Sequence, residues 1–402
     1  MISIELFAGA GGLAMGVSRA GFQPAAIVEW DRWCCDTIRE NRARRTSPLA
    51  HWPAPIEGDI RPLNFAEHLG AIDLVAGGPP CQPFSLGGKH RAFLDDRDMW
   101  PQAVRVIRET SPRAFIFENV KGLMRAGFAP YRNYIHLQLQ HPGLPRRPDE
   151  DWSDHQARLQ RRHASKSPEY NVLPPQILNA ADYGVPQRRE RVFFVGFRAD
   201  LGVEWEFPAP THSVEALAHA QRPKGDYWDQ HRVASRQRRP TPRMAALGER
   251  IDAAPPTRAW RTVRDAIGDL PDPEFAPEKA AAFANHRFQP GARAYPGHTG
   301  SPLDEPAKTL KAGVHGVPGG ENMLARPDGT FRYFTVRESA RLQTFPDDYV
   351  FHGAWSEAMR QLGNAVPVAL GELVASDVMR AMTAKSPKFG RPRESTPNSF
   401  LV

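Results

Sequence analysis

Short apolar segments recur along the first half of the chain, and apolar segments of helical length separate them. The segments with the length and composition of buried strands are residues 2–7, 27–28, 72–76, 113–117 and 192–196. Strands that alternate with helices in this way predict an α/β fold built on a doubly wound sheet. In such a fold ligands bind outside the carboxyl ends of the strands, so the residues that follow each strand are the first candidates for a site.

The composition of the chain changes after residue 200. Residues 1–200 and a return segment, residues 333–385, are predicted to form the sheet domain. The intervening residues 201–332 are rich in proline, arginine and glycine, which indicates an inserted domain with short strands and irregular structure. Residues 386–402, with their prolines and serines, are predicted to be a disordered tail.

Cys81 lies in the sequence Gly-Gly-Pro-Pro-Cys-Gln-Pro-Phe-Ser, directly after the apolar segment 72–76. Prolines make this loop stiff, and a thiol on a stiff loop at a strand end is displayed as a nucleophile. Taken alone, such a cysteine is more often a small apolar residue. Two other motifs favour the nucleophile: Glu118 also follows a strand, and Arg189 and Arg191 share one face of an extended segment.

Together these motifs resemble, in kind and in order, those of the DNA cytosine-5 methyltransferases, over most of the chain. The matching segments are Leu6–Gly12, Glu29–Asp31, Gly58–Ile60, Pro79–Ser85, Glu118–Val120, Gln187–Arg191, Arg337–Pro346 and Gly363–Pro367. The resemblance implies a Rossmann-like sheet that binds S-adenosylmethionine, and a target-recognition domain at residues 201–332. It implies methyl transfer to C5 of a cytosine in duplex DNA at a specific site.

The chemistry assigns a role to each candidate catalytic residue. C5 of cytosine is a poor nucleophile until a thiolate adds to C6, and Cys81 is suited to that addition. Charge then develops on N3 and O2, where Glu118 and Arg191 would stabilise it; Glu118 needs a proton to do so, which partial desolvation favours. Arg189 either supports the nucleophile loop or contacts a phosphate. No residue is evident as the base that removes the C5 proton, for which ordered water is a candidate.

The methyl donor is inferred from the start of the chain. A strand leads into a glycine-rich turn, and a second strand ends in Glu29, from which a carboxylate reaches ribose hydroxyls. The turn lacks the Gly-x-Gly-x-x-Gly spacing of phosphate-binding loops, which favours S-adenosylmethionine. By resemblance Phe7 and Trp30 flank the adenine. The full predicted cofactor set is Phe7, Ala8, Gly9, Gly11, Gly12, Glu29, Trp30, Asp59, Ile60, Pro80, Asn364 and Val366.

A polar, basic segment with a glycine pair, residues 86–97, is predicted to be a mobile loop that closes over the substrate. The predicted DNA contacts are Gln82, Ser85, Lys89, Arg91, Arg97 and Thr309. Because C6 must be attacked from above the ring, the target cytosine has to be flipped out of the duplex.

The charge of the chain agrees with a nucleic-acid partner, since the formal net charge is +7. Residues 221–264 hold eleven lysines and arginines against four acids. There Tyr227, Trp228 and Trp260 alternate with arginines, a mixture typical of DNA contact, although a charged segment is also common on a merely solvated surface.

Three cysteines and no paired metal-ligand motif predict neither a metal site nor a disulfide. An opening strand and the lack of an apolar segment near 18 residues predict neither a signal peptide nor a membrane span, hence a cytoplasmic protein. We expect a monomer. A restriction endonuclease with the same target site is a possible partner, without a stable complex.

Two alternatives to this function stay open. The tRNA cytosine-5 methyltransferases have a similar catalytic domain but a compact recognition region and a Cys-Phe-Thr motif, and this chain has no cysteine beyond Cys81. A DNA-binding regulator could keep the same fold without turnover.

Overall fold

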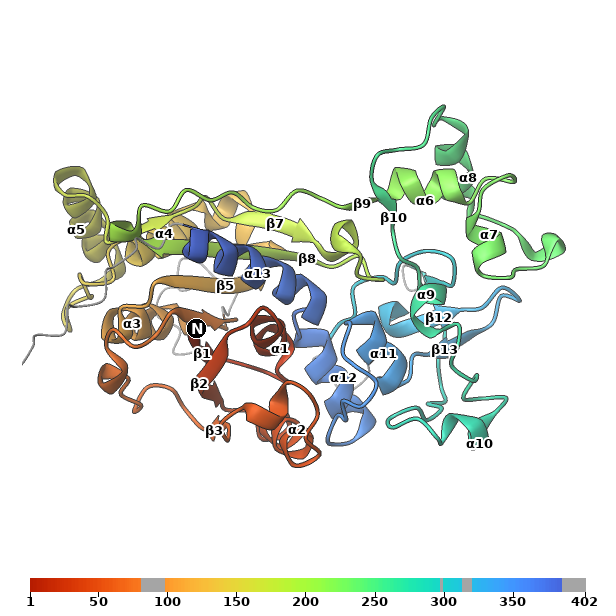
Figure 1. Cartoon of the computed structure of the whole chain (residues 1–402), viewed down its shortest axis with the longest axis horizontal. Helices are drawn as coiled ribbons and strands as arrows, with labels where there is room; N and C mark the ends of the chain where they lie inside the picture. Colours follow the sequence, from red (N-terminus) through yellow and green to blue (C-terminus); the bar gives the residue numbers. More distant parts are fainter. Residues whose placement is uncertain (81–97, 297–298, 313–319, 385–402) are drawn as a thin grey trace, which may run out of the picture.

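An eight-stranded sheet forms the centre of the molecule, with strand order β3-β2-β1-β4-β5-β8-β6 (Figure 1). The eighth strand, β7, pairs with β8 on the same side as β6, β6 with the last residues of β8 and β7 with its first residues. The computed structural model describes residues 1–80, 98–296, 299–312 and 320–384. The predicted tail, residues 386–402, therefore lies outside the described residues.

The elements follow the predicted alternation. The strands are β1 (Ile2–Leu6), β2 (Gln23–Glu29), β3 (Ile56–Glu57), β4 (Leu74–Gly77), β5 (Ala114–Val120), β6 (Tyr170–Val172), β7 (Gln176–Asn179), β8 (Glu190–Arg198), β9 (His212–Ser213), β10 (Arg258–Ala259), β11 (Ser301–Pro302), β12 (Met323–Ala325) and β13 (Phe331–Tyr333). The α-helices are α1 (Gly12–Arg19), α2 (Arg32–Ala43), α3 (Trp100–Thr110), α4 (Ala129–Gln140), α5 (Trp152–Ser165), α6 (Val214–Ala220), α7 (Tyr227–Gln230), α8 (Pro242–Glu249), α9 (Val263–Ile267), α10 (Pro277–Ala280), α11 (Val336–Leu342), α12 (Trp355–Asn364) and α13 (Val368–Ala384).

The sheet is parallel from β3 to β5, and β8 then joins β5 in the antiparallel direction. Side chains of β5 alternate between the two faces. Phe115 and Phe117 pack with α3 and α4, whereas Ala114 and Ile116 pack with α1 and α13. Helices therefore cover both faces, which confirms the predicted doubly wound α/β fold.

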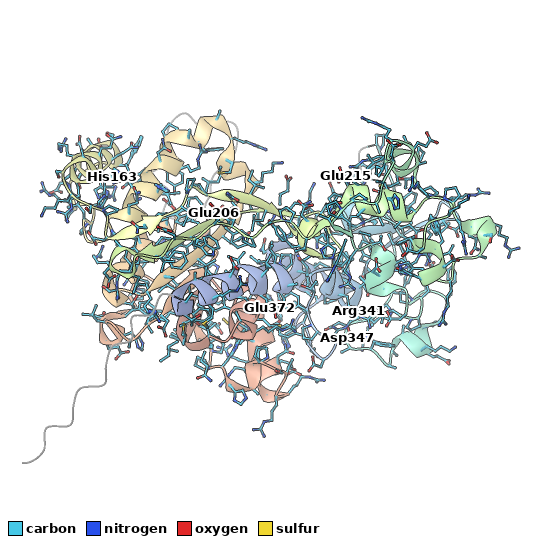
Figure 2. All side chains as sticks on the ribbon, turned by 45° about the horizontal axis from the view of Figure 1, so that its top comes forward. His163, Glu206, Glu215, Arg341, Asp347 and Glu372 are labelled. Carbon is cyan, nitrogen blue, oxygen red and sulfur yellow. The ribbon has the colours of Figure 1, made fainter. Side chains whose placement is uncertain are left out.

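Helix α13 returns the end of the chain to the sheet by packing closely on α1. A Cβ atom at Gly12 would lie 2.4 Å from the carbonyl oxygen of Val366, and one at Gly16 would lie 2.4 Å from the backbone nitrogen of Glu372. Only glycine permits backbones to approach this closely. Figure 2 shows α13, with Glu372, lying along the sheet domain.

The stretch Trp355–Ala384, which contains α12 and α13, is the one helical span among the described residues that is long and apolar enough to cross a membrane by length and composition. In the fold 56% of its apolar window is buried. Its apolar character is accounted for by packing against α1 and the sheet, as in the core helix of a globular domain.

The inserted region lies at one end of the molecule and α5 at the other (Figure 1). Figure 2 labels His163 on α5 and Glu215 on α6 at these two ends. The strands of the inserted region form a β9–β10 pair and a three-stranded sheet of β11, β12 and β13. The region also contains the short helices α6 to α10, which the predicted texture of short strands and irregular structure did not include.

The predicted boundary at residue 201 comes before a segment that still packs on the sheet domain. Val203 is buried against the α13 side of the sheet, and Trp205 donates a hydrogen bond of 2.8 Å from Nε1 to Asp377 of α13. At the other boundary, α11 contributes Val336 to the α1 core and Leu342 to the core of the inserted region. The two parts are thus continuous through α11.

The aromatic residues predicted to contact DNA are core residues instead. Tyr227 and Trp228 are 4% and 1% exposed, and Trp260 is 9% exposed. The hydroxyl of Tyr227 donates to Asp304 at 2.9 Å, and the indole of Trp228 donates to the Gln221 carbonyl at 2.8 Å. Their polar atoms are satisfied within the inserted region, so this part of the DNA-contact prediction is wrong.

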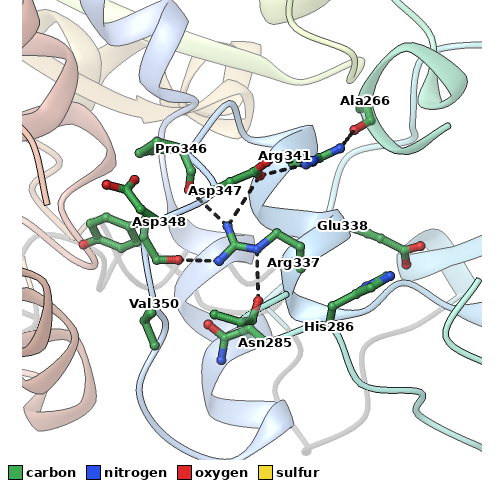
Figure 3. Close-up of polar contacts among 12 residues, drawn as sticks. Ala266, Asn285, His286, Arg337, Glu338, Arg341, Pro346, Asp347, Asp348 and Val350 are labelled. Carbon is green, nitrogen blue, oxygen red and sulfur yellow. Dashed lines mark hydrogen bonds and ion pairs between the residues drawn. The ribbon is translucent and has the colours of Figure 1, made fainter. Parts of the chain in front are cut away.

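Two arginines of α11 join the inserted region to the return segment (Figure 3). The fully buried Arg337 donates to the carbonyls of Ala284, Pro346 and Tyr349 at 3.0, 3.0 and 2.7 Å. One turn later, Arg341 forms a bidentate pair with Asp347 at 2.7 and 2.6 Å. The planar guanidinium suits such multiple contacts.

A buried acid lies in the central strand. Glu5 is 2% exposed on β1 and accepts a hydrogen bond of 2.7 Å from the Ser3 hydroxyl. Burial raises the pKa of Glu5 to about 7, and the Ser3 hydrogen bond opposes the rise. A carboxyl whose pKa is raised on folding stabilises the fold below its unfolded pKa and loses that contribution as pH rises through the folded pKa.

We predict that Glu5→Gln, which keeps the shape and removes the charge, stabilises the protein increasingly as pH rises. The gain in unfolding free energy over the native protein should be small near pH 5 and reach about 3 kcal/mol above pH 8, from the difference between the two pKa values. Urea denaturation at a series of pH values measures it. The exposed Glu249→Gln serves as the control, and a gain for Glu5→Gln that does not change with pH would contradict the prediction.

Candidate active site

The carboxyl ends of β1, β2, β4 and β5 meet at one edge of the sheet, because these strands are parallel neighbours. The antiparallel β8 begins at the same edge, where Val120 pairs with Arg191 and Glu118 pairs with Phe193. Most of the predicted site residues that the structure describes lie on loops and strand ends at this edge.

Glu118 and Arg191 form a buried ion pair. They are diagonal neighbours on one face of the β5–β8 ladder, and Arg191 Nε lies 2.7 Å from Glu118 Oε1. The two residues are 7% and 8% exposed. Apart from this ion pair, Oε1 has no other partner among the described residues. This oxygen keeps the capacity to bond a further group.

The electrostatics of the pair set its protonation behaviour. Burial raises the pKa of Glu118, while the positive charges of Arg191 and Arg189 oppose that rise. Burial also lowers the pKa of Arg191, and the Glu118 charge opposes that change. Because a carboxylate away from water is costly, any group that draws Arg191 away favours the protonated form of Glu118.

The loop after β4 lies against Glu118. A Cβ atom at Gly78 would lie 3.2 Å from Glu118 Oε2, and Asn119 donates a hydrogen bond of 3.1 Å to the Pro79 carbonyl. Pro80 is exposed and is the last described residue before Cys81. Cys81 itself lies outside the described residues.

The other predicted residues of that segment are also outside the described part of the chain. They are Gln82, Ser85, Lys89, Arg91 and Arg97.

Arg189 is fully buried, two residues before Arg191. Its Nη1 donates to the Leu310 carbonyl at 2.9 Å, and its Nη2 donates to the Gly363 carbonyl at 2.6 Å. Burial lowers its pKa well below the usual range, although Glu118 opposes the change. The prediction of a phosphate contact is therefore wrong, because this side chain has no exposed surface.

Glu29, at the end of β2, organises the glycine-rich turn after β1. Its carboxylate accepts backbone N–H groups of Gly9 at 2.7 Å, Trp30 at 2.9 Å and Asp31 at 2.8 Å. Burial raises the pKa of Glu29, and these hydrogen bonds oppose the rise. Within the described part of the chain, Oε2 accepts only the Gly9 N–H, so it has room for one more donor.

The turn itself, with Phe7, Ala8 and Gly9, connects β1 to α1. Phe7 and Gly9 have φ of +53° and +55°, and a Cβ at Gly9 would meet no atom within 4 Å. At Gly11, where φ is +82°, the Trp52 ring lies 3.2 Å from the Cβ position. The backbone at Gly9 is thus open to a ligand, whereas Gly11 and Gly12 pack against protein.

The other predicted cofactor residues differ in how far their side chains are exposed. Trp30 is 76% exposed, which is unusual for tryptophan and leaves a free apolar face beside Glu29. Asp59 is exposed and pairs with Arg61 at 3.1 Å. Ile60 is 3% exposed and its side chain packs in the core below the sheet, and its contact with the adenine stays a prediction.

On the return segment Asn364 is exposed, at the end of α12, and Val366 is buried. The Val366 carbonyl lies against Gly12, which brings this segment to the turn after β1. Thr309, predicted to contact DNA, is half-buried and donates a hydrogen bond of 2.6 Å to the Arg188 carbonyl.

The sequence motifs gave no role to Gln187 or Tyr349, yet each forms a hydrogen bond that connects two distant segments of the site. Gln187 is fully buried and its Oε1 accepts the Leu310 N–H at 3.0 Å. The Tyr349 hydroxyl donates to the Ala10 carbonyl in the turn after β1 at 2.6 Å. Both occur in or near matching motifs, and that position was the only signal of their importance.

No group of three or more His, Cys, Asp or Glu side chains in the described residues is arranged to hold a metal ion. The site therefore consists of the Glu118–Arg191 pair, the buried Arg189, and the turn that Glu29 holds.

Solved structures share this fold. Methyltransferase Dnmt2 of Schizosaccharomyces pombe superposes with a TM-score of 0.54 at 16% identity and covers 96% of this chain and 99% of that one. Methyltransferase EhMeth of Entamoeba histolytica gives 0.52 at 12% identity and covers 96% and 98%.

Sequence relatives extend over nearly the whole chain. The type II methyltransferase M.Eco47II of Escherichia coli is 31% identical over 94% of this chain and 79% of its own length. M.NgoMIV of Neisseria gonorrhoeae is 31% identical over 94% and 97%. The family described as C-5 cytosine-specific DNA methylase matches residues 1–143 and 163–380. The chain therefore belongs to the C-5 cytosine-specific DNA methylase family and is a DNA (cytosine-5-)-methyltransferase.

Proposed function

We propose that the enzyme methylates C5 of one cytosine in a specific duplex site, after flipping that cytosine out of the helix and bonding its C6 to Cys81. The observation that carries this proposal is the buried Glu118–Arg191 pair, set where β5 ends and β8 begins. The loop that leads to Cys81 lies directly against Glu118.

In this mechanism the Cys81 thiolate adds to C6, and the electrons move toward N3 and O2 of the ring. Glu118 gives a proton to N3, and Arg191 donates a hydrogen bond to O2. Once C5 carries the methyl group, the C5 proton passes to a base and the N3 proton returns to Glu118. The sulfur–C6 bond breaks with its electron pair going to the Cys81 thiolate, which restores the neutral ring. No residue is assigned as the base for the C5 proton, and ordered water is the candidate.

The pair at 2.7 Å suits this sequence of events. While Arg191 lies beside Glu118, its charge favours the carboxylate. When O2 of the cytosine accepts from Arg191, Glu118 loses part of that stabilisation in a site that excludes water. Its pKa then rises, so the carboxyl becomes the proton donor that N3 requires.

S-adenosylmethionine fits the residues at the turn after β1, and it supplies an electrophilic methyl group. The free acceptor capacity of Glu29 Oε2 suits a ribose hydroxyl, and the open backbone at Gly9 allows close approach. The exposed face of Trp30, with Phe7, is placed to cover the adenine, while Asp59 and Asn364 remain available as polar contacts.

The exposed cations of the inserted region provide the DNA contacts. Flipping a base costs a few kcal/mol, which phosphate contacts must offset. The exposed lysines and arginines of residues 221–264 are Lys224, Arg232, Arg236, Arg239, Arg243, Arg250, Arg258 and Arg261.

The setting is inferred from the relatives, several of which are type II methyltransferases. We infer a cytoplasmic monomer whose partner in function is a restriction endonuclease that cuts the same site, without a stable complex.

The first test is methyl transfer from radiolabelled S-adenosylmethionine to unmethylated duplex DNA, with bisulfite sequencing of the product. We expect label at C5 of one repeated site and none with Cys81→Ser. Unmodified tRNA is assayed in parallel. Label in tRNA alone would favour the tRNA enzyme, and tight DNA binding without any label would favour a regulator.

Glu118→Gln should lower kcat by about 10²- to 10⁴-fold, because an amide cannot give a proton to N3. The native rate should also fall as pH rises through the pKa of Glu118, since the active form is protonated, and this alkaline limb should be missing from the variant. Glu190→Gln, which removes only the exposed partner of Lys121, is the matched control. An unchanged pH profile in Glu118→Gln would contradict the role.

The double variant Arg236→Ala/Arg239→Ala should weaken duplex binding. The slope of log K against log salt should become shallower by about 0.9 for each phosphate that the variant no longer neutralises. Arg161→Ala/Lys166→Ala, which removes two exposed positive charges at α5 and its carboxyl end on the other side of the molecule, controls for net charge. Equal salt slopes for the two variants would show that this surface does not contact DNA.

A further inference from the structure

A single buried cation connects three parts of the site. Arg189 is fully buried, yet its hydrogen bonds go to backbone carbonyls rather than to a carboxylate. The acceptors, Leu310 and Gly363, lie 121 and 174 residues further along the chain. A buried charge is expensive, so two well-placed carbonyls and the nearby Glu118 have to compensate for it.

The first carbonyl belongs to the inserted region. Leu310 follows Thr309, and both of its backbone polar groups bond to the chain just before β8. Gln187 accepts the Leu310 N–H at 3.0 Å, and Arg189 donates to the Leu310 carbonyl at 2.9 Å. Earlier in the same segment, Ala307 exchanges backbone hydrogen bonds of 2.9 and 2.8 Å with Pro186 and Arg188. The position of residues 307–310 is thus set by the chain that enters β8.

The second carbonyl belongs to the cofactor side. Gly363 precedes Asn364, and a Cβ at Gly363 would lie 2.2 Å from the backbone nitrogen of Ala312. The end of α12 therefore presses directly on the chain that follows Leu310. One guanidinium holds the two segments at a fixed separation, because its two Nη atoms are rigidly spaced.

We propose that Arg189 is a positioning residue that couples DNA binding to cofactor binding, by fixing the DNA-side segment 307–312 against the cofactor-side segment 363–366. The inference rests on the proposed function of both segments. A ligand that fixes one segment also fixes the Arg189 guanidinium, which then keeps the other segment in position through its carbonyl. Each ligand therefore increases the affinity for the other.

The test measures that coupling directly. The probes are S-adenosylhomocysteine, which cannot react, and a short duplex that carries the site mapped by bisulfite sequencing. The dissociation constant of each is measured by calorimetry with and without the other. In the native enzyme we expect each ligand to tighten the other by about 5- to 150-fold.

In Arg189→Lys a single ammonium cannot reach both carbonyls. The coupling factor, which is the fold by which one ligand tightens the other, should therefore fall toward one. Arg188→Lys, at the adjacent position just before β8, is the matched control and should keep the native factor. If Arg189→Lys does not fold, Gln187→Leu, which releases the Leu310 N–H and the Leu342 carbonyl while leaving Arg189 in place, should reduce the factor in part.

A native coupling factor of one overturns the inference, as does an Arg189→Lys enzyme with the native factor. A variant that loses affinity for both ligands equally, with the factor unchanged, also overturns it and shows a purely structural role. Failure of the native enzyme to bind either probe would instead count against the proposed function.

Discussion

Three charged side chains, Glu118, Arg189 and Arg191, share a volume from which water is almost excluded, and the rest of the site is built around that constraint. Charges in such a place interact strongly and must be compensated by partners of fixed geometry. Here the partners come from the neighbouring strand, from the inserted region at Leu310 and from the end of α12 at Gly363. The antiparallel entry of β8 beside β5 makes this possible, because it directs the arginines and the acid to one face at one edge.

The parts of the fold that follow from local pattern could be predicted. The apolar strands, the glycine turn after β1 and the acids at the ends of β2 and β5 are encoded within a few residues each, and parallel neighbours necessarily bring their ends together. The position of Glu118 beside Arg191 does not follow from this logic, because Arg191 lies at the start of β8, which pairs with β5 in the antiparallel direction.

Features that depend on distant partners could not be predicted. Tyr227 and Trp228 lie among arginines in the sequence, and only the positions of Asp304 and the Gln221 carbonyl show that they are core. The same holds for Arg189, whose acceptors are more than a hundred residues away. The side chain of Ile60 likewise belongs to a core that forms only when α3 packs on the sheet. Composition reports residue type, whereas burial is decided by tertiary packing.

The two edges of the sheet differ in how much other structure is attached to them. At the edge with the site, hydrogen bonds of Gln187 and Arg189 to Leu310 tie the chain that enters β8 to the inserted region. At the far edge α5 is attached, and residues 144–162, which include most of it, are the internal interruption in the family match. Added chain at that edge leaves the chemistry untouched.

The attachment of residues 307–312 to β8 also determines how a new target specificity could arise. Residues 214–260 pack mainly on one another around Tyr227 and Trp228, so we expect this part of the inserted region to be a unit that another sequence can replace. The strip around Leu310 cannot be exchanged with it, because Gln187 and Arg189 hold that strip by its backbone. Recombination that swaps specificity between relatives should therefore favour crossover points before this strip, which would be inherited with the catalytic half.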